Sequence, residues 1–237
     1  MNQVINGDCL VELPKIKTQS VDLVFVDPPF GINYKYDGYK DNLKRADYSN
    51  WSVDWVMQIH RILKSNGTFW LASGDKYVSL LDELCSQFFY RRSWVIWHYT
   101  FGQNQKDNWS KSHTHLLYYV RNRYHYTFND KDIRVPSLRQ LKYKDKRANP
   151  LGKIPDDVWN IPRLCGTFKE RVAHSCQMPL QVLDNIIKTC SNKGDLVLDP
   201  MAGSCTTLVS AKNLGRNYIG IELSKKYVDI GNKRLGN

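Results

Sequence analysis

The segment that most constrains the fold is residues 22–30, which read Asp-Leu-Val-Phe-Val-Asp-Pro-Pro-Phe. Its run of four apolar residues predicts a short strand with both faces covered, as in a parallel sheet. Pro28 and Pro29 end this strand directly after Asp27, because proline can neither donate to a sheet ladder nor continue a helix. Ligands of open α/β sheets bind at the carboxyl ends of the strands. The sequence therefore predicts an acidic group at the ligand-binding edge of a sheet.

This arrangement can bind a flat ring that carries an amino group. Ionised Asp27 only accepts hydrogen bonds, and the carbonyl of Pro28 is a second acceptor. Together they could hold both hydrogens of one NH2 group and turn the nitrogen lone pair outward, while Phe30 stacks on the ring. The alternative is a structural turn between strand and loop, in which Asp27 caps a backbone group.

Composition favours a nucleic-acid partner. The chain has 237 residues, of which 42% are hydrophobic, enough for one large α/β domain or a domain with a small insert. Its 34 Lys and Arg residues exceed its 23 Asp and Glu residues and give a net charge of +11. That surplus favours a polyanion, although an irrelevant basic surface is the alternative.

The cysteines and the hydropathy pattern bear on the cellular compartment. The six cysteines form no C-x-x-C pair and no zinc spacing. We expect no signal peptide, and the sequence contains no apolar run of membrane-spanning length. We therefore expect reduced thiols in a cytoplasmic protein without a membrane partner.

The last third of the chain contains a second strand that ends in an acid. Residues 196–204 read Leu-Val-Leu-Asp-Pro-Met-Ala-Gly-Ser, which predicts a buried strand followed by a tight turn of small residues. Such a turn lets a ligand approach the backbone. A helix is predicted over 206–213, and the next strand ends in Glu222, an acid that can accept hydrogen bonds from ribose hydroxyls. The absence of G-x-G-x-x-G argues against a dinucleotide.

Between these two strands, we predict the elements from the hydrophobic periodicity and from residues that end helices and strands. Residues 31–48 are polar and predict a long substrate-binding or lid loop. A helix capped by Ser52 or Asp54 is expected to stop at Asn66-Gly67, before a strand over 68–72. His113 and His115 share one face of a later predicted strand, but no third ligand is suggested, so no metal is expected.

With both acid-ended strands in view, the chain resembles the S-adenosylmethionine-dependent amino-methyltransferases of DNA. Its Asp-Pro-Pro-Phe motif precedes its cofactor motif, which is the order of the β class. The resemblance runs from Asn6-Gly7-Asp8 to Gly220-Ile-Glu222. It implies one α/β Rossmann-like methyltransferase domain over residues 1–237, with a mostly parallel central sheet. Within it we expect a catalytic half (1–120), a small basic target-recognition insert (121–169) and a cofactor-binding half (170–237).

The resemblance also implies a mechanism and a site. A methyl group would pass from S-adenosylmethionine directly, in line, to the amino group of a base flipped out of the DNA helix. The catalytic residues implied are Asp27, Pro28, Pro29 and Phe30. The cofactor-binding residues implied are Asp8, Cys9, His174, Gln177, Pro179, Asp199, Pro200, Met201, Ala202, Gly203, Ser204, Thr206 and Glu222.

The chain departs from the family pattern in its cofactor loop. Met201 and Cys205 stand where Phe and Gly are usual. The β-carbon of Cys205 requires either a negative backbone φ there or looser cofactor binding. At the catalytic motif, Phe30 replaces the commoner Tyr, which keeps the stacking face and loses a hydroxyl.

The insert begins where the composition becomes basic. Residues 121–147 carry nine Lys or Arg, interleaved with tyrosine and phenylalanine. That pattern predicts contact with nucleic acid, with a solvated charged loop as the alternative. The residues predicted to bind DNA are Arg134, Arg139, Lys142, Lys144, Lys146 and Arg147.

The predicted reaction is methylation of adenine N6 in double-stranded DNA. The nearest alternative is cytosine N4, but the cytosine enzymes of the family more often carry Ser where this chain has Asp27. An RNA methyltransferase and a nucleic-acid-binding module that has lost catalysis are further alternatives. By resemblance, a homodimer and a cognate restriction endonuclease are open expectations.

Overall fold

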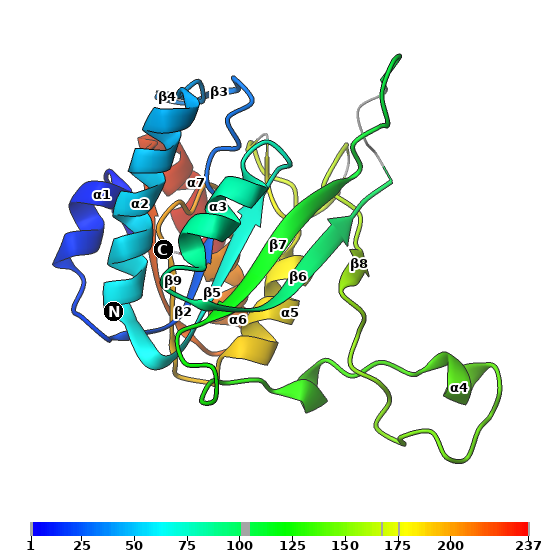
Figure 1. The fold of residues 1–237 in the computed structure, drawn as a ribbon. Helices are drawn as coiled ribbons and strands as arrows, with labels where there is room; N and C mark the ends of the chain where they lie inside the picture. The colour runs from blue at the N-terminus through cyan, green and yellow to red at the C-terminus, as the bar shows by residue number, and fades with distance from the viewer. Residues whose placement is uncertain (1, 101–104, 167, 175, 237) are drawn as a thin grey trace.

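The computed structural model describes residues 2–236 apart from 101–104, 167 and 175 (Figure 1). Its main sheet has the strand order β1-β10-β9-β2-β5-β7-β6-β8. Most neighbouring strands are parallel, and β7 is antiparallel to both of its neighbours. The mostly parallel, Rossmann-like sheet predicted from the sequence is therefore confirmed. The strands are β1 (Gln3–Asn6), β2 (Val21–Val26), β5 (Leu63–Ser73), β6 (Tyr90–His98), β7 (His113–Val120), β8 (Val158–Asn160), β9 (Leu196–Asp199) and β10 (Asn217–Glu222).

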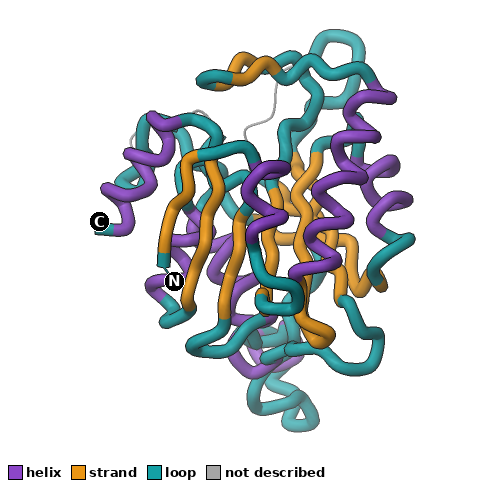
Figure 2. The backbone as a smooth tube through the Cα atoms, turned by 90° about the vertical axis from the view of Figure 1, so that its left-hand side faces the viewer, coloured by secondary structure: helices purple, strands orange, loops and turns teal. Residues whose placement is uncertain are grey.

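Helices cover both faces of this sheet (Figures 1 and 2). One hydrophobic core lies under α1, α2 and α3, and a second lies under α5 and α6. Alternate residues of β2 enter opposite cores: Val24 joins the first core and Phe25 the second. The apolar run before Asp27 is thus buried on both faces, as predicted. The helices are α1 (Cys9–Glu12), α2 (Arg45–Ile62), α3 (Val78–Cys85), α5 (Leu180–Cys190), α6 (Thr206–Asn213) and α7 (Lys225–Leu235).

Three predictions for the chain between β2 and β5 are wrong: the cap of the helix, the start of the following strand, and a 31–48 loop without secondary structure. Helix α2 begins at Arg45, and the hydroxyl of Ser52 donates to the Tyr48 carbonyl inside the helix instead of capping its start. The strand after it begins at Leu63 and runs through Asn66-Gly67, because Leu63 already pairs with β2. The predicted 31–48 loop contains a small hairpin, β3 (Lys35–Tyr36) and β4 (Tyr39–Lys40).

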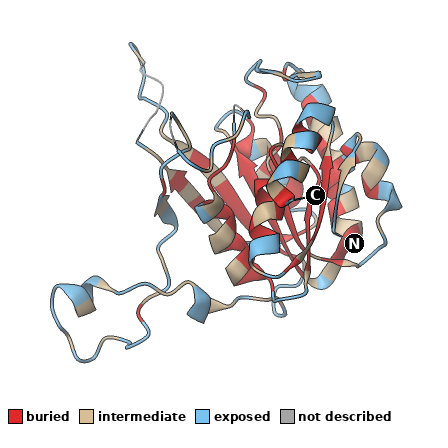
Figure 3. Ribbon diagram, turned by 180° about the vertical axis from the view of Figure 1, so that it is seen from behind, coloured by how far each residue is buried: buried red, intermediate tan, exposed pale blue. Residues whose placement is uncertain are grey.

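The basic insert leaves the sheet at the edge opposite the carboxyl end of β2. Strand β7 is antiparallel to β5, so that Val120 pairs with Thr68 at the start of β5. The side chain of Asn129 then donates to the carbonyls of Lys188 and Ser191 at the end of α5. Beyond it the chain forms an exposed lobe with the short elements η2 (Asp130–Asp132) and α4 (Leu138–Leu141) (Figure 3).

Strand β8 brings the insert back to the catalytic edge. It pairs in parallel with β6 at the carboxyl end of that strand, with Asn160 opposite His98. Only the last part of the insert therefore reaches the edge where Asp27 lies. None of the helices within the described ranges combines the length and hydropathy that crossing a bilayer requires.

Candidate active site

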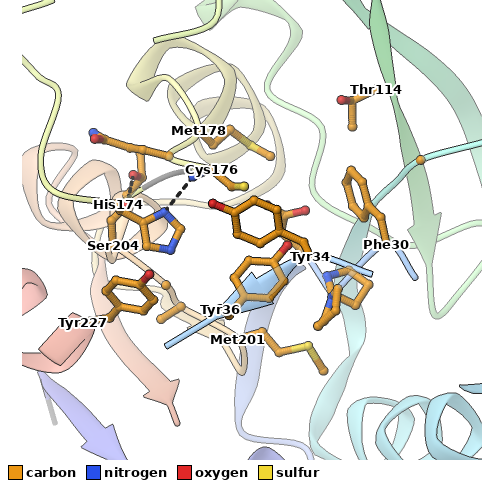
Figure 4. Close-up of a pocket in the computed structure, with 18 of the residues that line it drawn as sticks. Phe30, Tyr34, Tyr36, Thr114, His174, Cys176, Met178, Met201, Ser204 and Tyr227 are labelled. Atoms are coloured by element: carbon orange, nitrogen blue, oxygen red, sulfur yellow. Dashed lines mark hydrogen bonds between the residues drawn. The ribbon is translucent and has the colours of Figure 1, made fainter. Parts of the chain in front are cut away.

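A cavity of about 1010 Å³ opens at the carboxyl ends of the strands (Figure 4). Its wall brings together the two acid-ended strands, which are far apart in the sequence. The predicted site residues that line it are Asp8, Cys9, Asp27, Pro28, Pro29, Phe30, His174, Gln177, Asp199, Pro200, Met201, Ala202, Gly203, Ser204, Thr206 and Glu222.

Both residues that supply the acceptors of the catalytic motif, Asp27 and Pro28, line this cavity. Among the hydrogen bonds of the described residues, none reaches the carboxylate of Asp27 or the carbonyl of Pro28. Desolvation raises the pKa of Asp27 to about 7, and the negative charge of Asp199 adds to the effect. The Phe30 ring packs closely on Gly74 at the end of β5, because a β-carbon on Gly74 would lie 3.0 Å from it. The geometry favours a ligand-binding role for Asp27 over a capping role.

Asp199 and Glu222 hold the small-residue turn between β9 and α6. The Asp199 carboxylate accepts hydrogen bonds from the Met201 backbone N–H at 3.1 Å and from the Thr207 hydroxyl at 2.6 Å. Glu222 accepts from the backbone N–H of Gly203 at 2.7 Å. Burial raises the pKa of Asp199 to about 7 and also raises the pKa of Glu222. The two acids therefore shape the backbone that a ligand would approach.

His174 forms an aromatic wall of the same half. Its ring lies 4.4 Å from that of Tyr227, edge to face. Burial, with a smaller effect of the Arg234 charge, lowers the pKa of His174 to about 4, so this imidazole is neutral near pH 7. Its Nδ1 accepts from the Cys176 backbone N–H at 3.3 Å.

Three predicted cofactor residues also have structural roles. The side chain of Gln177 accepts from the Val172 N–H and donates to the Glu170 carbonyl, which fixes the loop before α5. Pro179 is the N-cap of α5 and lies outside the described cavity wall, where Met178 lies instead. Asp8 caps α1 by accepting from the Leu10 N–H at 2.8 Å.

Of the two alternatives given for Cys205, a negative φ is excluded. Its φ is +61°, the left-handed conformation that glycine usually supplies. The residue is fully buried and is absent from the described cavity wall. Its Sγ would lie 2.2 Å from a β-carbon placed on Gly231 of α7. The side chain thus packs behind the turn, where it leaves the cavity clear.

The predicted DNA-binding residues lie in the lobe, away from the cavity. Arg134 is paired with Asp130 and donates to the Gly152 carbonyl, so its guanidinium ties the lobe together. Arg139 and Arg147 both pair with Asp145. The remaining three, Lys142, Lys144 and Lys146, are exposed.

Other residues at the cavity were missed by the sequence reasoning. Lys76, Lys111 and Arg163 give its wall positive charge, and Lys111 pairs with Asp75 at 2.7 Å. Figure 4 shows the rings of Tyr34 and Tyr36 between His174 and Phe30. The unusual length of the 31–48 segment was the only signal for these tyrosines.

The donor set of the cavity fits S-adenosylmethionine. Its acids, Asp8, Asp199 and Glu222, suit amino and hydroxyl groups, and the wall also includes the sulfur of Met201. No group of three or more metal-ligating side chains occurs in the described part of the chain. At the predicted histidine pair, the Trp94 indole donates to His115 Nδ1 at 3.0 Å.

Comparisons with known proteins agree with this geometry. A sequence model of the family described as DNA methylase, for N6 and N4 methylation, matches residues 21–233. DNA adenine methyltransferase YhdJ of Escherichia coli is 35% identical over 98% of this chain and 82% of its own length. Type II methyltransferase M.HpaI of Haemophilus parainfluenzae is 32% identical over 98% of this chain and 74% of its own length.

Solved structures share the fold. The complex of M1.HpyAVI with S-adenosylmethionine superposes with a TM-score of 0.71 at 22% identity and covers all of both chains. The cytosine-N4-specific PvuII DNA methyltransferase superposes with a TM-score of 0.74 at 19% identity, over 99% of this chain and 86% of that one. Given the family match and the two acid-ended strands, the chain belongs to the S-adenosylmethionine-dependent DNA amino-methyltransferases, the family of N6-adenine and N4-cytosine enzymes.

Proposed function

We propose that this protein methylates N6 of adenine in double-stranded DNA, at a base flipped out of the helix. The observation that carries the proposal is that Asp27 and Pro28 line the cavity at the end of β2, and that no described hydrogen bond uses the Asp27 carboxylate or the Pro28 carbonyl. They match the two hydrogens of an exocyclic amino group. As the nitrogen becomes pyramidal and positively charged during transfer, both acceptors stabilise it more strongly than in the ground state.

The remaining parts of the cavity have complementary roles in this proposal. S-adenosylmethionine, when bound, supplies an electrophilic methyl group. Glu222 and the Gly203 turn would hold it on one side, with Asp8 at its adenine end. Phe30 would stack on the flipped base, and Asp27, once ionised, can also take the proton that the methylated nitrogen must lose.

Adenine is favoured over cytosine because Asp27 stands before the two prolines, where the family's cytosine enzymes more often have Ser. The adenine methyltransferase named among the relatives, YhdJ, supports the same choice. The cytosine-N4 enzyme with the same fold makes N4 of cytosine the second candidate.

The base can be identified directly. Unmethylated genomic DNA is incubated with the protein and labelled S-adenosylmethionine, and the nucleosides are then separated by mass spectrometry. We expect labelled N6-methyladenine, and none with an Asp27→Ala control. Labelled N4-methylcytosine would overturn the choice of base, and labelled RNA without labelled DNA would overturn the substrate class.

A further inference from the structure

The backbone that follows the two acceptors is held by side chains that lie behind the cavity wall. Asp41 is fully buried, at 0% exposure, and its carboxylate accepts hydrogen bonds from the backbone N–H groups of Gly31 at 2.9 Å and Ile32 at 3.0 Å. A buried carboxylate is stable only when it is well paired. Its two partners are the amides that directly follow Phe30.

Tyr48 fixes the other side of Phe30. It is also fully buried, and its hydroxyl donates to the carbonyl of Pro29 at 2.9 Å. Its ring stacks on Tyr77 at 4.0 Å with an interplanar angle of 14°, which fixes the direction of the hydroxyl. Neither Asp41 nor Tyr48 belongs to the described cavity wall.

These contacts fix both peptide groups that flank Phe30. The Pro29–Phe30 peptide is held through its carbonyl, and the Phe30–Gly31 peptide is held through its N–H. Lys76 donates to the carbonyl of Gly31, which holds the next peptide as well. The Pro28 carbonyl accepts none of the described hydrogen bonds, whereas the carbonyls of Pro29 and Gly31 are both engaged.

We propose that Asp41 and Tyr48 are positioning residues, which hold the loop so that the Pro28 carbonyl stays free and Phe30 stays in place for the target base. The inference rests on the proposed function, because it takes Asp27 and Pro28 as the acceptors of the target amino group. In-line transfer requires the reacting atoms to be placed within a fraction of an ångström. Such precision comes from groups that support the contacting residues, as these two side chains do here.

The test compares two tyrosines that are equally buried. Tyr48→Phe removes the hydroxyl that holds Pro29 and keeps the ring stack. Tyr119→Phe is the matched control, because its buried hydroxyl donates to Asp82 at 2.8 Å, away from the catalytic loop. We expect Tyr48→Phe to lower kcat about tenfold, the loss of roughly one positioning hydrogen bond. Its dissociation constant for S-adenosylmethionine should stay within about twofold of wild type, and Tyr119→Phe should keep its kcat.

Two substitutions of Asp41 should lower kcat to different extents. Asp41→Ala removes both acceptors, whereas Asp41→Asn keeps one amide oxygen for one of the two N–H groups. We therefore expect kcat to fall most for Asp41→Ala and to recover in part for Asp41→Asn, with cofactor binding again unchanged. Amide hydrogen exchange of residues 27–33 should be faster in Tyr48→Phe than in Tyr119→Phe.

Two results would overturn the inference. One is that the wild-type protein is active and that Tyr48→Phe and Tyr119→Phe have the same kcat. The other is equal hydrogen exchange of residues 27–33 in these two variants, which needs no activity to measure. Wild-type protein that methylates no DNA would instead refute the proposed function, so the two failures are distinguishable.

Discussion

The carboxyl groups of Asp27 and Asp199 stand at the ends of adjacent strands, and the charge of Asp199 adds to the effect of burial in raising the pKa of Asp27. Strands β2 and β9 pair with Val24 opposite Leu198, one residue before Asp199. Asp199 is held by Thr207 and the Met201 amide, whereas the Asp27 carboxylate has no hydrogen-bond partner among the described residues. The two acids therefore have different roles. Asp199 holds the turn between β9 and α6, whereas Asp27 is available to a ligand.

The raised pKa of Asp27 predicts that the rate of methylation depends on pH near neutrality. Only ionised Asp27 is a pure acceptor, and its pKa is raised to about 7 in the folded protein. Activity should thus be low on the acid side and rise through neutral pH. We expect kcat/KM for DNA to fall about tenfold per pH unit below the midpoint and to level off above it. In Asp199→Asn the midpoint should move to lower pH, and an unmoved midpoint would show that Asp199 does not act on Asp27.

Substitution by alanine should lower the free energy of unfolding by different amounts at two glycines of one loop. Gly31 and Gly38 both have positive φ, at +69° and +75°. A β-carbon at Gly31 would lie 2.1 Å from the Tyr77 ring, whereas none of the described atoms lies within 4 Å of one at Gly38. We expect Gly38→Ala to cost ~1–2 kcal/mol for the backbone alone and Gly31→Ala ~3 kcal/mol or more. Urea denaturation measures both, and equal losses would contradict the close packing at Tyr77.

The packing of Cys205 against Gly231 predicts a compensating pair. Gly231→Ala alone should destabilise the protein, because its β-carbon meets Sγ of Cys205. In a Cys205→Gly background the same change should be tolerated, since the sulfur is gone and Ala favours helix α7 by ~1 kcal/mol. A double-mutant cycle measures the coupling, which we expect to exceed ~1 kcal/mol. Additive effects would show that the two residues do not share this space.

Basic residues at the cavity and in the lobe should differ in their effect on DNA binding. Lys111 and Arg163 lie in the cavity wall, whereas Lys142, Lys144 and Lys146 stand in the lobe at the opposite edge. We expect Lys111→Ala with Arg163→Ala to weaken binding of a short duplex and to lower the salt slope by about one for each phosphate that the protein no longer neutralises. Replacing Lys142, Lys144 and Lys146 together by alanine should weaken duplex binding less. Fluorescence anisotropy at several salt concentrations measures both, and a larger effect of the lobe variant would place the DNA there.

The sequence predicted the parts of the site that are local. A strand that ends in Asp-Pro-Pro fixes where Asp27 lies on the sheet, because prolines stop the strand and parallel strands share a carboxyl edge. Asp199 is likewise followed by a proline, Pro200, and Glu222 ends the next strand of the sheet. The family resemblance then supplied the cofactor and the reaction, which spacing alone leaves open.

What the sequence could not predict depends on contacts between distant residues. Nothing near Asp41 or Tyr48 reveals that they hold the catalytic loop, since their partners come from the tertiary fold. The insert is predicted to contact DNA because of its charge, but that charge does not reveal that the direction of β7 places the lobe at the edge away from Asp27. Cys205 has a left-handed conformation, and its thiol fills the space beside Gly231, a contact that no local pattern encodes.

The most direct test of this mechanism is single-turnover methylation by Asp27→Leu. This change keeps a branched side chain of similar shape but removes both carboxylate oxygens, so residue 27 no longer offers an acceptor to the target amino group. We expect the rate constant for transfer to fall about a thousandfold, while S-adenosylmethionine binds as to wild type. A rate within about tenfold of wild type would contradict the assignment of Asp27 as the acceptor of the target amino group.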